Sequence, residues 1–309
     1  MSFDLTALDA YIEDQDFPLL AQMQAVGSLA DYATIQTGIK KSSHLQFLNT
    51  DCVFQSDTCS RTAADTTALS QKTITVGAIQ LNEDLCTKDL NGYWAQTMVA
   101  KGARGEEVIP GAIESVWMGD KINCIQNQLA IADWQGDLTS ATNNLSYYDG
   151  VLVQVDADAT VIDGNPTGIT TGTGITVDNI IPILQGMWAA QPDLLMGKEG
   201  VSCFMGWDTY QLYVNALVNA NLFHFKGEDG VTRLHGTNVS LIPQTGLTGT
   251  NRIILTPAKN LVVGMDGEGD EDNMEVWYSK DDRVNKMNIA FKRGTQYFYG
   301  NEVVSFALV

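Results

Sequence analysis

The strongest helical pattern in the sequence predicts one long helix over residues 107–132. Its apolar side chains recur at helical spacing and form one stripe, made of Ile109, Ile113, Val116, Ile122, Ile125 and Leu129. Pro110 falls in the first turn, where proline is tolerated, and Gly136 suits the break that follows the helix. At about 1.5 Å per residue the helix is roughly 37 Å long. A helix of this length counts against an all-β fold.

Two strand-like segments precede this helix and predict a long β-hairpin. Residues 45–54 and 73–81 are rich in β-branched and apolar side chains, and the segment between them is polar and rich in threonine. An isolated two-stranded ribbon is only marginally stable in water, so we expect this hairpin to rest on another surface. The alternative is an ordinary hairpin inside a β-sandwich.

The rest of the chain mixes predicted helices and strands, so the predicted fold class is α+β. Residues 1–39 have the character of an arm with helical pieces, interrupted at Pro18. Further helices are predicted at 84–100, 177–190 and 208–220. Strands are predicted within 150–177, at 201–207, 238–243, 251–257 and 274–278, and from Met287 onward.

An acidic, glycine-spaced segment, MDGEGDEDN at 265–273, lies between two strand-like runs and raises the question of a calcium site. An EF-hand loop needs glycine at its sixth position and glutamate at its twelfth. Counted from Asp266, these positions hold Glu271 and Trp277, and a count from Asp270 fails as well. We therefore interpret the segment as a solvated turn and predict no metal site there.

The sequence contains no recognisable motif of an enzyme or a cofactor site. It lacks a complete G-x-G-x-x-G, a P-loop, a G-x-S-x-G and an H-E-x-x-H, and its three histidines are isolated. Five cysteines at irregular spacing, without a C-x-x-C pair, predict free thiols in a reducing compartment. No apolar run approaches the roughly 18 residues of a membrane helix, and the N-terminal sequence lacks the pattern of a secretory signal. We predict no catalytic residues, no cofactor and no membrane partner, and we expect folding in a cytosol.

Charge is distributed unevenly along this acidic chain. The formal net charge of −19 repels phosphate backbones, which disfavours sequence-independent binding of nucleic acid. Residues 1–39 hold six acids and neither lysine nor arginine, whereas five bases fall within 280–293. We expect the acidic arm to dock on the basic segment of an adjacent subunit. Together with charged residues of the hairpin, the candidate interface residues are Asp9, Glu13, Asp14, Asp16, Asp57, Arg61, Lys72, Lys286, Lys292 and Arg293.

Several stretches, taken in order, resemble one protein family. They are KTITVGAIQLNEDLC, IADWQGD followed by YYDGVL, DNIIPILQGMWAAQPDLL, VSCFMGWDTYQLYVNAL, and the segment that runs from LTPAKNLVVGMDGEGDEDNMEVWY to KRGTQYFY. An acidic arm, a long hairpin, one long helix, an α/β block and a returning strand pair follow one another. This order is similar to that of the Hong Kong 97-type major capsid proteins of tailed double-stranded DNA phages, and the resemblance covers nearly the whole chain.

The resemblance implies an α+β, Hong Kong 97-like capsid fold. Its parts are expected to be an N-terminal arm at 1–39, an E-loop hairpin at 40–82, a P-domain with its spine helix at 83–139, an A-domain at 140–265 and returning P-domain strands at 266–309. Copies are expected to form pentamers and hexamers of an icosahedral shell around double-stranded DNA, without sequence-specific binding. Expected partners are separate scaffolding, portal and decoration proteins, because the chain has no room for a fused scaffolding segment. The expected location is the virion, after assembly in the cytoplasm of a bacterial host.

Other interpretations remain open. An encapsulin-type nanocompartment resembles this fold but encloses protein cargo, and a phage tail or host-binding module is also acidic and β-rich. The predicted long helix counts against the tail module. A hydrolase with unrecognised carboxylates is a third alternative. If the capsid interpretation holds, the hairpin tip at 56–72 lies over a neighbouring subunit, and deleting residues 57–69 leaves a folded subunit that no longer assembles.

Overall fold

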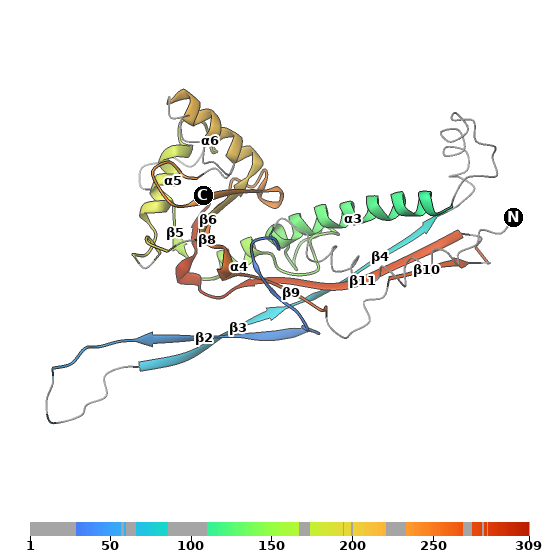
Figure 1. Cartoon of the computed structure of the whole chain (residues 1–309), viewed down its shortest axis with the longest axis horizontal. Helices are drawn as coiled ribbons and strands as arrows, with labels where there is room; N and C mark the ends of the chain where they lie inside the picture. The colour runs from blue at the N-terminus through green and yellow to red at the C-terminus, as the bar shows by residue number, and fades with distance from the viewer. Residues whose placement is uncertain are drawn as a thin grey trace.

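The computed structural model describes residues 29–56, 59, 66–85, 110–166, 174–193, 195–198, 200–220, 233–267, 274–279, 281–282 and 284–308. These residues form two five-stranded sheets and one separate two-stranded hairpin. A long helix runs along the first sheet, shorter helices lie beside the second, and the hairpin projects from the body (Figure 1). None of the helices in these residues combines the length and the apolar character needed to cross a membrane.

The first sheet is built around one long strand near the C-terminus. Its order is β1-β9-β11-β10, and β4 pairs along the other edge of β11. The strands are β1 (Thr34–Gln36), β4 (Gly77–Leu85), β9 (Leu261–Met265), β10 (Met274–Ser279) and β11 (Val284–Tyr297). Met287, Ile289 and Phe291 of β11 are buried and alternate with more exposed residues, which confirms the half-buried strand predicted from Met287 onward.

Helix α3 (Pro110–Gln135) lies along β4 and β11 and confirms the long helix predicted at 107–132 (Figure 1). Its 26 residues correspond to about 39 Å. Where side chains of the helix are described, Ile125 and Leu129 are buried, as the apolar stripe requires. Lys121 on the helix pairs with Glu83 on β4 at 2.5 Å, so an ion pair as well as apolar packing joins the helix to the sheet.

The helix ends where two glycines allow close contact between backbone segments. The N–H of Gly150 donates to the carbonyl of Gly136 at 2.8 Å. A Cβ atom at Gly136 would lie 2.5 Å from the carbonyl oxygen of Tyr148, and one at Gly150 would lie 2.5 Å from that of Trp134. The predicted break at Gly136 is therefore confirmed, and its cause is the close approach of the returning chain.

The second sheet has the order β5-β12-β8-β6-β7. Its strands are β5 (Ile162–Asp163), β6 (Val201–Gly206), β7 (Ser240–Gln244), β8 (Ile253–Pro257) and β12 (Val304–Phe306), and short 3-10 turns occur at Thr245–Leu247, Ala258–Asn260 and Gly300–Glu302. All of β6 is buried, because Cys203 faces the core formed with helices α5 (Ile180–Ala189) and α6 (Trp207–Asn219), whereas Phe204 faces Trp134 of α3. The predictions of a buried strand at 201–207 and of helices at 177–190 and 208–220 are confirmed.

Helix α4 (Val151–Ala157) occupies part of the region predicted as strand at 150–177. The alternating sequence VLVQV suggested a strand, but Val151, Leu152 and Val155 are all buried in the same core. Burial of residues one and four apart is a helical pattern, so packing against the body decided the local structure. The short strand β5 follows, and residues 167–173 lie outside the described residues.

Two further expectations at element boundaries were wrong. Asp84 and Leu85 end strand β4 instead of starting a helix, and the rest of that predicted helix lies outside the described residues. Strand β9 pairs with β1 and β11 in the first sheet, whereas β12 pairs with β5 and β8 in the second. The boundary expected at residue 265 therefore does not follow the sheets, because pairing between strands distant in sequence leaves no local signal.

Candidate assembly surfaces

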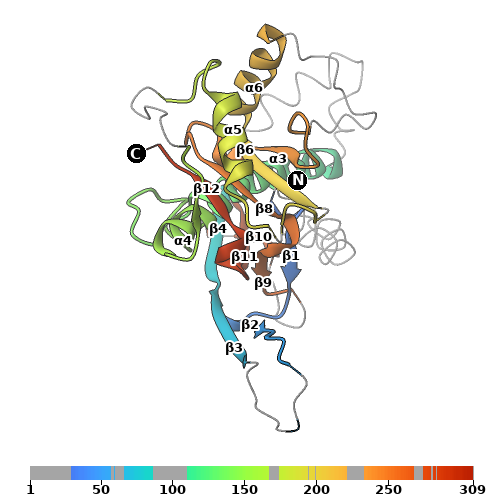
Figure 2. The same ribbon diagram turned by 90° about the vertical axis from the view of Figure 1, so that its left-hand side faces the viewer.

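A hairpin of strands β2 (Ser42–Asp51) and β3 (Thr66–Thr75) projects from the body (Figures 1 and 2). Its ten residue pairs run without interruption from Ser42 and Thr75 at the base to Asp51 and Thr66 near the tip. The two strands form a sheet of their own, which confirms the predicted hairpin and contradicts the alternative of a hairpin inside a sandwich. A free ribbon is marginally stable in water, so contacts at its base are needed to hold it.

One face of the hairpin is anchored to the body near its base. Leu45 and Ile74 are buried in a small apolar cluster with Val262 of β9. Phe47, further out on the same face, packs edge-on against Tyr299, with the ring centroids 5.0 Å apart. The proximal half of the hairpin is therefore fixed to the first sheet, and its distal half extends beyond these contacts.

A charged cluster ties β3 to the end of helix α4. The Lys72 ammonium donates to Asp158 Oδ2 at 2.8 Å and lies 3.7 Å from the centre of the Tyr297 ring. The Tyr297 hydroxyl donates to the same oxygen at 2.8 Å, and the Thr160 hydroxyl donates to Asp158 Oδ1 at 2.6 Å. Partial burial raises the pKa of the Asp158 carboxyl, but hydrogen bonds from Lys72, Thr160 and Tyr297 outweigh it and hold the pKa well below its usual value. Lys72, a predicted interface residue, thus has a partner in its own subunit.

We expect Asp158→Asn to weaken the subunit at neutral pH and to have less effect in acid. A carboxyl whose pKa is lowered by folding adds stability above its unfolded pKa, about 3.9, and this stability is lost as the pH falls toward the lower folded value. The gap in urea midpoint between wild type and variant should be constant above about pH 5 and shrink below about pH 4. Asp163→Asn, at an exposed position, serves as the control. A difference in urea midpoint that stays constant below about pH 4 would contradict the lowered pKa of Asp158.

The other face of the hairpin is exposed and mostly polar, with one apolar pair. Leu48 and Leu69 lie directly opposite each other in the ladder, and their side chains are 63% and 66% exposed. Beyond the last pair of the ladder, Phe54 is 100% exposed. Apolar side chains gathered on a projecting ribbon mark a surface that contacts another molecule. The polar, threonine-rich segment between the two predicted strands did not indicate this surface.

A buried ion pair joins the first sheet to helix α3. Arg293 of β11 donates from Nε to Asp133 Oδ1 at 2.9 Å and from Nη2 to Asp133 Oδ2 at 2.7 Å, and neither side chain has exposed surface. The Tyr148 hydroxyl donates to Asp133 Oδ1 at 2.8 Å. Burial and the charge of Asp133 raise the pKa of Tyr148 well above its usual value, so this hydroxyl stays a donor. The prediction that Arg293 contacts another subunit was wrong, because its side chain is enclosed within its own.

The acidic segment after β9 begins with a buried carboxylate. Asp266 is 2% exposed and accepts a hydrogen bond from Lys292 Nζ at 2.6 Å. The interpretation of this segment as a solvated turn was therefore wrong at Asp266, and residues 268–273 lie outside the described residues. Lys292, another predicted interface residue, is held in part by this contact within the subunit.

Asp266→Asn is expected to destabilise the subunit by about 1–3 kcal/mol, because it removes the negative charge from a buried, hydrogen-bonded ion pair. The same substitution at Asp281, which is exposed in the turn after β10, should change the free energy of unfolding by at most about 0.5 kcal/mol. Urea unfolding of the two variants measures both values. Equal and small effects would show that the pair with Lys292 contributes little.

Comparison with known proteins places this geometry in a structural class. No protein-family model and no curated protein matches the sequence. Among solved structures, a chain of the satellite phage P4 procapsid that includes size determination (Sid) protein matches with a TM-score of 0.63 over 98% of this chain and 96% of its own, at 12% identity. The chain has the Hong Kong 97 capsid-protein fold. The α+β fold class predicted from the sequence is confirmed.

Two further capsids share the Hong Kong 97 fold with this chain. The capsid of Myoviridae phage XM1 matches with a TM-score of 0.57 at 11% identity, over 90% of both chains. The capsid of an empty GTA particle matches with a TM-score of 0.53 at 10% identity, over 91% of this chain and 89% of its own. Because the matches span nearly all of each chain, the projecting hairpin and both sheets belong to one fold.

The remaining predicted interface residues of this Hong Kong 97-type chain are only partly described. Lys286 on β11 pairs with Asp282 four residues earlier, at the surface. The other candidates lie outside the described residues: Asp9, Glu13, Asp14, Asp16, Asp57 and Arg61. Docking of the acidic arm on the late basic segment therefore stays a prediction, now without Arg293.

A second exposed apolar surface lies on helix α6 and was missed by the sequence analysis. Trp207, Val214 and Val218 are exposed, and Tyr210 packs edge-on against Trp207 with ring centroids 5.9 Å apart. Their spacing of three, four and seven residues puts them on one side of the helix. The helical spacing of these apolar residues in the sequence could have predicted the stripe. The sequence does not show which side of the helix faces the sheet.

The described ranges hold no group of three histidine, cysteine or acidic side chains placed to bind a metal ion. Among the cysteines described there, Cys52, Cys59 and Cys124 are exposed free thiols, and Cys203 is buried, which raises the pKa of its thiol. The distinctive features of the described residues are thus a projecting ribbon, two exposed apolar surfaces and internal ion pairs.

Proposed function

We propose that this chain is a major capsid protein whose copies form the pentamers and hexamers of an icosahedral shell around packaged double-stranded DNA. The observation that carries the proposal is the match to a chain of a phage P4 procapsid over 98% of this chain and 96% of that one. The projecting hairpin supports the proposal as well, because the described residues of its distal half extend beyond the contacts that hold its proximal half to the body. The protein acts as a structural component without an enzymatic role.

In this proposal each part of the fold has a place in the shell subunit. The N-terminal arm comprises residues 1–39, and the β2–β3 hairpin within 40–82 is the E-loop. The P-domain combines α3, which is the spine helix, with strands β4, β9, β10 and β11 of the first sheet. The A-domain combines the second sheet with α5 and α6. Compared with the boundaries expected from the sequence, we assign β9 to the P-domain and β12 to the A-domain. The reason is that β9 pairs within the first sheet and β12 within the second.

Two physical properties support a shell. The exposed apolar surfaces of the hairpin and of α6 lie on different parts of the subunit, so each can meet a different surface of a neighbouring copy. A weak contact of this kind is repeated by symmetry throughout a closed shell, and many such contacts together stabilise it. The net charge of −19 suits a container that encloses DNA without binding its phosphates tightly.

Scaffolding, portal and decoration proteins are the proposed partners, and the virion is the proposed location, after assembly in the host cytoplasm.

Negative-stain electron microscopy of the purified protein, expressed alone and with a candidate scaffolding protein, tests this proposal. We expect closed, hollow shells of uniform size in at least one preparation. Particles isolated from the native host should contain DNA. Protein cargo in place of DNA would favour an encapsulin-type compartment, and soluble subunits without any shell in both preparations would contradict the proposal.

A further inference from the structure

One side chain at the end of the hairpin is exposed to an unusual degree. Phe54 follows β2 by three residues and has all of its surface in contact with solvent. Water disfavours an exposed phenyl ring, and large aromatic side chains are the residues that most often dominate the binding energy of protein interfaces. Phe54 is thus suited to fill a pocket on another molecule.

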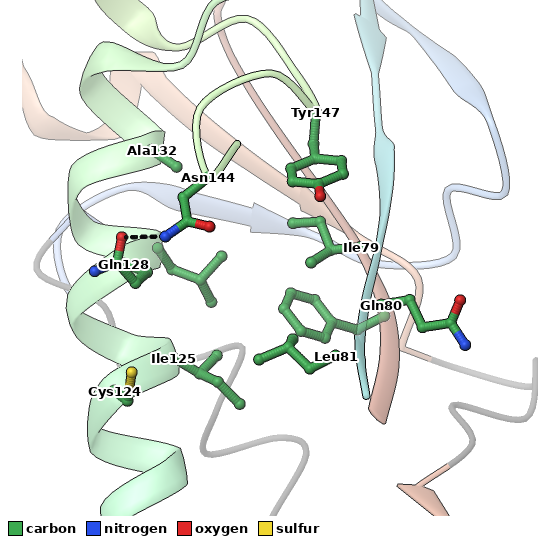
Figure 3. A pocket seen from close by; sticks show the side chains of 11 residues that line it. Ile79, Gln80, Leu81, Cys124, Ile125, Gln128, Ala132, Asn144 and Tyr147 are labelled. Atoms are coloured by element: carbon green, nitrogen blue, oxygen red, sulfur yellow. Dashed lines mark hydrogen bonds between the residues drawn. The ribbon is translucent and has the colours of Figure 1, made fainter. Parts of the chain in front are cut away.

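An apolar cavity of about 170 Å³ lies between helix α3 and strands β4 and β11 (Figure 3). Ile79 and Leu81 of β4 and Ile125 of α3 point into it, and Leu129 and Phe291 also contribute to its wall. An apolar cavity of roughly 150 Å³ is large enough to bind one benzene molecule, so this cavity can hold one phenyl ring.

The rim of the cavity is polar and reachable from solvent. The Asn144 side-chain amide donates to Gln128 Oε1 at 3.1 Å across one side of the rim (Figure 3). Cys124, whose thiol is free and exposed, lies at the rim one helical turn earlier than Gln128. A polar rim around an apolar interior is the arrangement found where a single anchoring side chain enters a protein interface.

The ring and the cavity are too far apart to meet within one subunit. Strands β3 and β4 follow each other in sequence, and the hairpin and β4 extend in opposite directions from their junction (Figure 1). At about 3.3 Å per residue, the ten-residue strands carry the tip roughly 33 Å from that junction. A contact between two different surfaces of identical chains joins subunits head to tail, and such contacts generate rings when the rotation closes.

We infer that Phe54 of one subunit inserts into the α3–β4–β11 cavity of a neighbouring copy. This inference rests on the proposed shell function and names the receiving site of the hairpin. Burial of the ring removes apolar surface from water on both sides, while the polar rim stays at the edge of the contact.

The native Cys124 thiol reports whether the cavity is covered. In free wild-type subunits a maleimide should label Cys124, and in assembled shells the labelling rate, measured by peptide mass spectrometry, should fall at least about tenfold, as expected when a contact excludes water. Shells of Phe54→Ala, where they form at high concentration, should regain most of the labelling. Phe54→Leu, which keeps a large apolar side chain, should retain most of the protection.

A pair of matched substitutions on α3 tests the cavity itself. Cys124→Trp places an indole at the rim and should block entry, whereas Asn127→Trp adds the same bulk at an exposed position that does not line the cavity. Phe54→Ala and Cys124→Trp should each raise the critical concentration for assembly on the order of tenfold, as for a central anchor, and Asn127→Trp should not. The double variant Phe54→Ala, Cys124→Trp should assemble as well as whichever single variant assembles less readily, because the two substitutions remove the same contact.

The outcomes separate this inference from the proposed function. Wild-type protein that forms no shells would overturn the proposed function. Wild-type shells in which Cys124 stays as reactive as in free subunits, with Phe54→Ala assembling normally, would overturn only the Phe54 contact. Circular dichroism of each variant subunit establishes that a loss of assembly does not come from unfolding.

Discussion

Replacing Arg293 with methionine is expected to destabilise the isolated subunit by about 3–5 kcal/mol, because the change leaves the carboxylate of Asp133 buried without its counter-charge. Arg293 makes two hydrogen bonds to Asp133, and both side chains are fully buried. The pair joins β11 to the C-terminal half of α3, so the loss should loosen the packing of the helix on the sheet. Urea unfolding followed by tryptophan fluorescence measures the change, since Trp134 is buried beside Asp133.

Two further variants show whether the unpaired charge of Asp133 causes the loss of stability in Arg293→Met. Lys286→Met breaks a surface pair with Asp282 and should change the free energy of unfolding far less than Arg293→Met does. The double variant Asp133→Leu, Arg293→Met removes both charges and should recover much of the stability lost in Arg293→Met. A loss below about 1 kcal/mol for Arg293→Met would mean that water or another group compensates the Asp133 carboxylate.

Shortening the hairpin tip is expected to abolish shell assembly and to leave the subunit folded. Replacing residues 52–65 with Asn-Gly joins Asp51 to Thr66 through a two-residue turn and keeps all ten pairs of the ladder. This replacement leaves both strands complete, whereas a deletion of 57–69 would also remove the first four residues of β3. Each subunit in a closed shell repeats the lost contact, so a modest loss per subunit should prevent closure. Sedimentation and electron microscopy measure assembly, and circular dichroism measures folding.

A tip of the same length made of glycine and serine is the matched control for this variant. It keeps the reach of the hairpin but lacks the apolar side chains, so we expect it to fail in assembly as well. Normal shells from the short variant would show that the tip makes no essential contact. Unfolding of the short variant would show that the tip belongs to the core of its own subunit.

Elements with strong local periodicity could be predicted from the sequence, and elements shaped by distant contacts could not. The apolar stripe that contains Ile125 and Leu129 predicts α3, because its residues recur at helical spacing. The sequence of α4 alternates like a strand, and its helix forms because Val151, Leu152 and Val155 pack into a core shared with Tyr297. The pairing of β9 and β12 with different sheets likewise depends on partners far away along the chain.

The candidate site shows the same limit for charged residues. A list of bases in sequence cannot show which base is buried, and Arg293 and Lys286 looked alike although one is enclosed and the other lies at the surface. The buried state of Asp266 depends on Lys292, 26 residues later. The hairpin was predictable, but the exposure of Phe54 and the cavity beside α3 depend on three-dimensional packing that local patterns do not encode.

An electron cryomicroscopy reconstruction of the assembled particle would show directly how the subunits are arranged. We expect a closed shell of five- and six-membered rings of this chain, in which the β2–β3 hairpin of each subunit crosses onto a neighbouring copy. Particles without such rings, or a shell in which every hairpin folds back on its own subunit, would contradict this expectation.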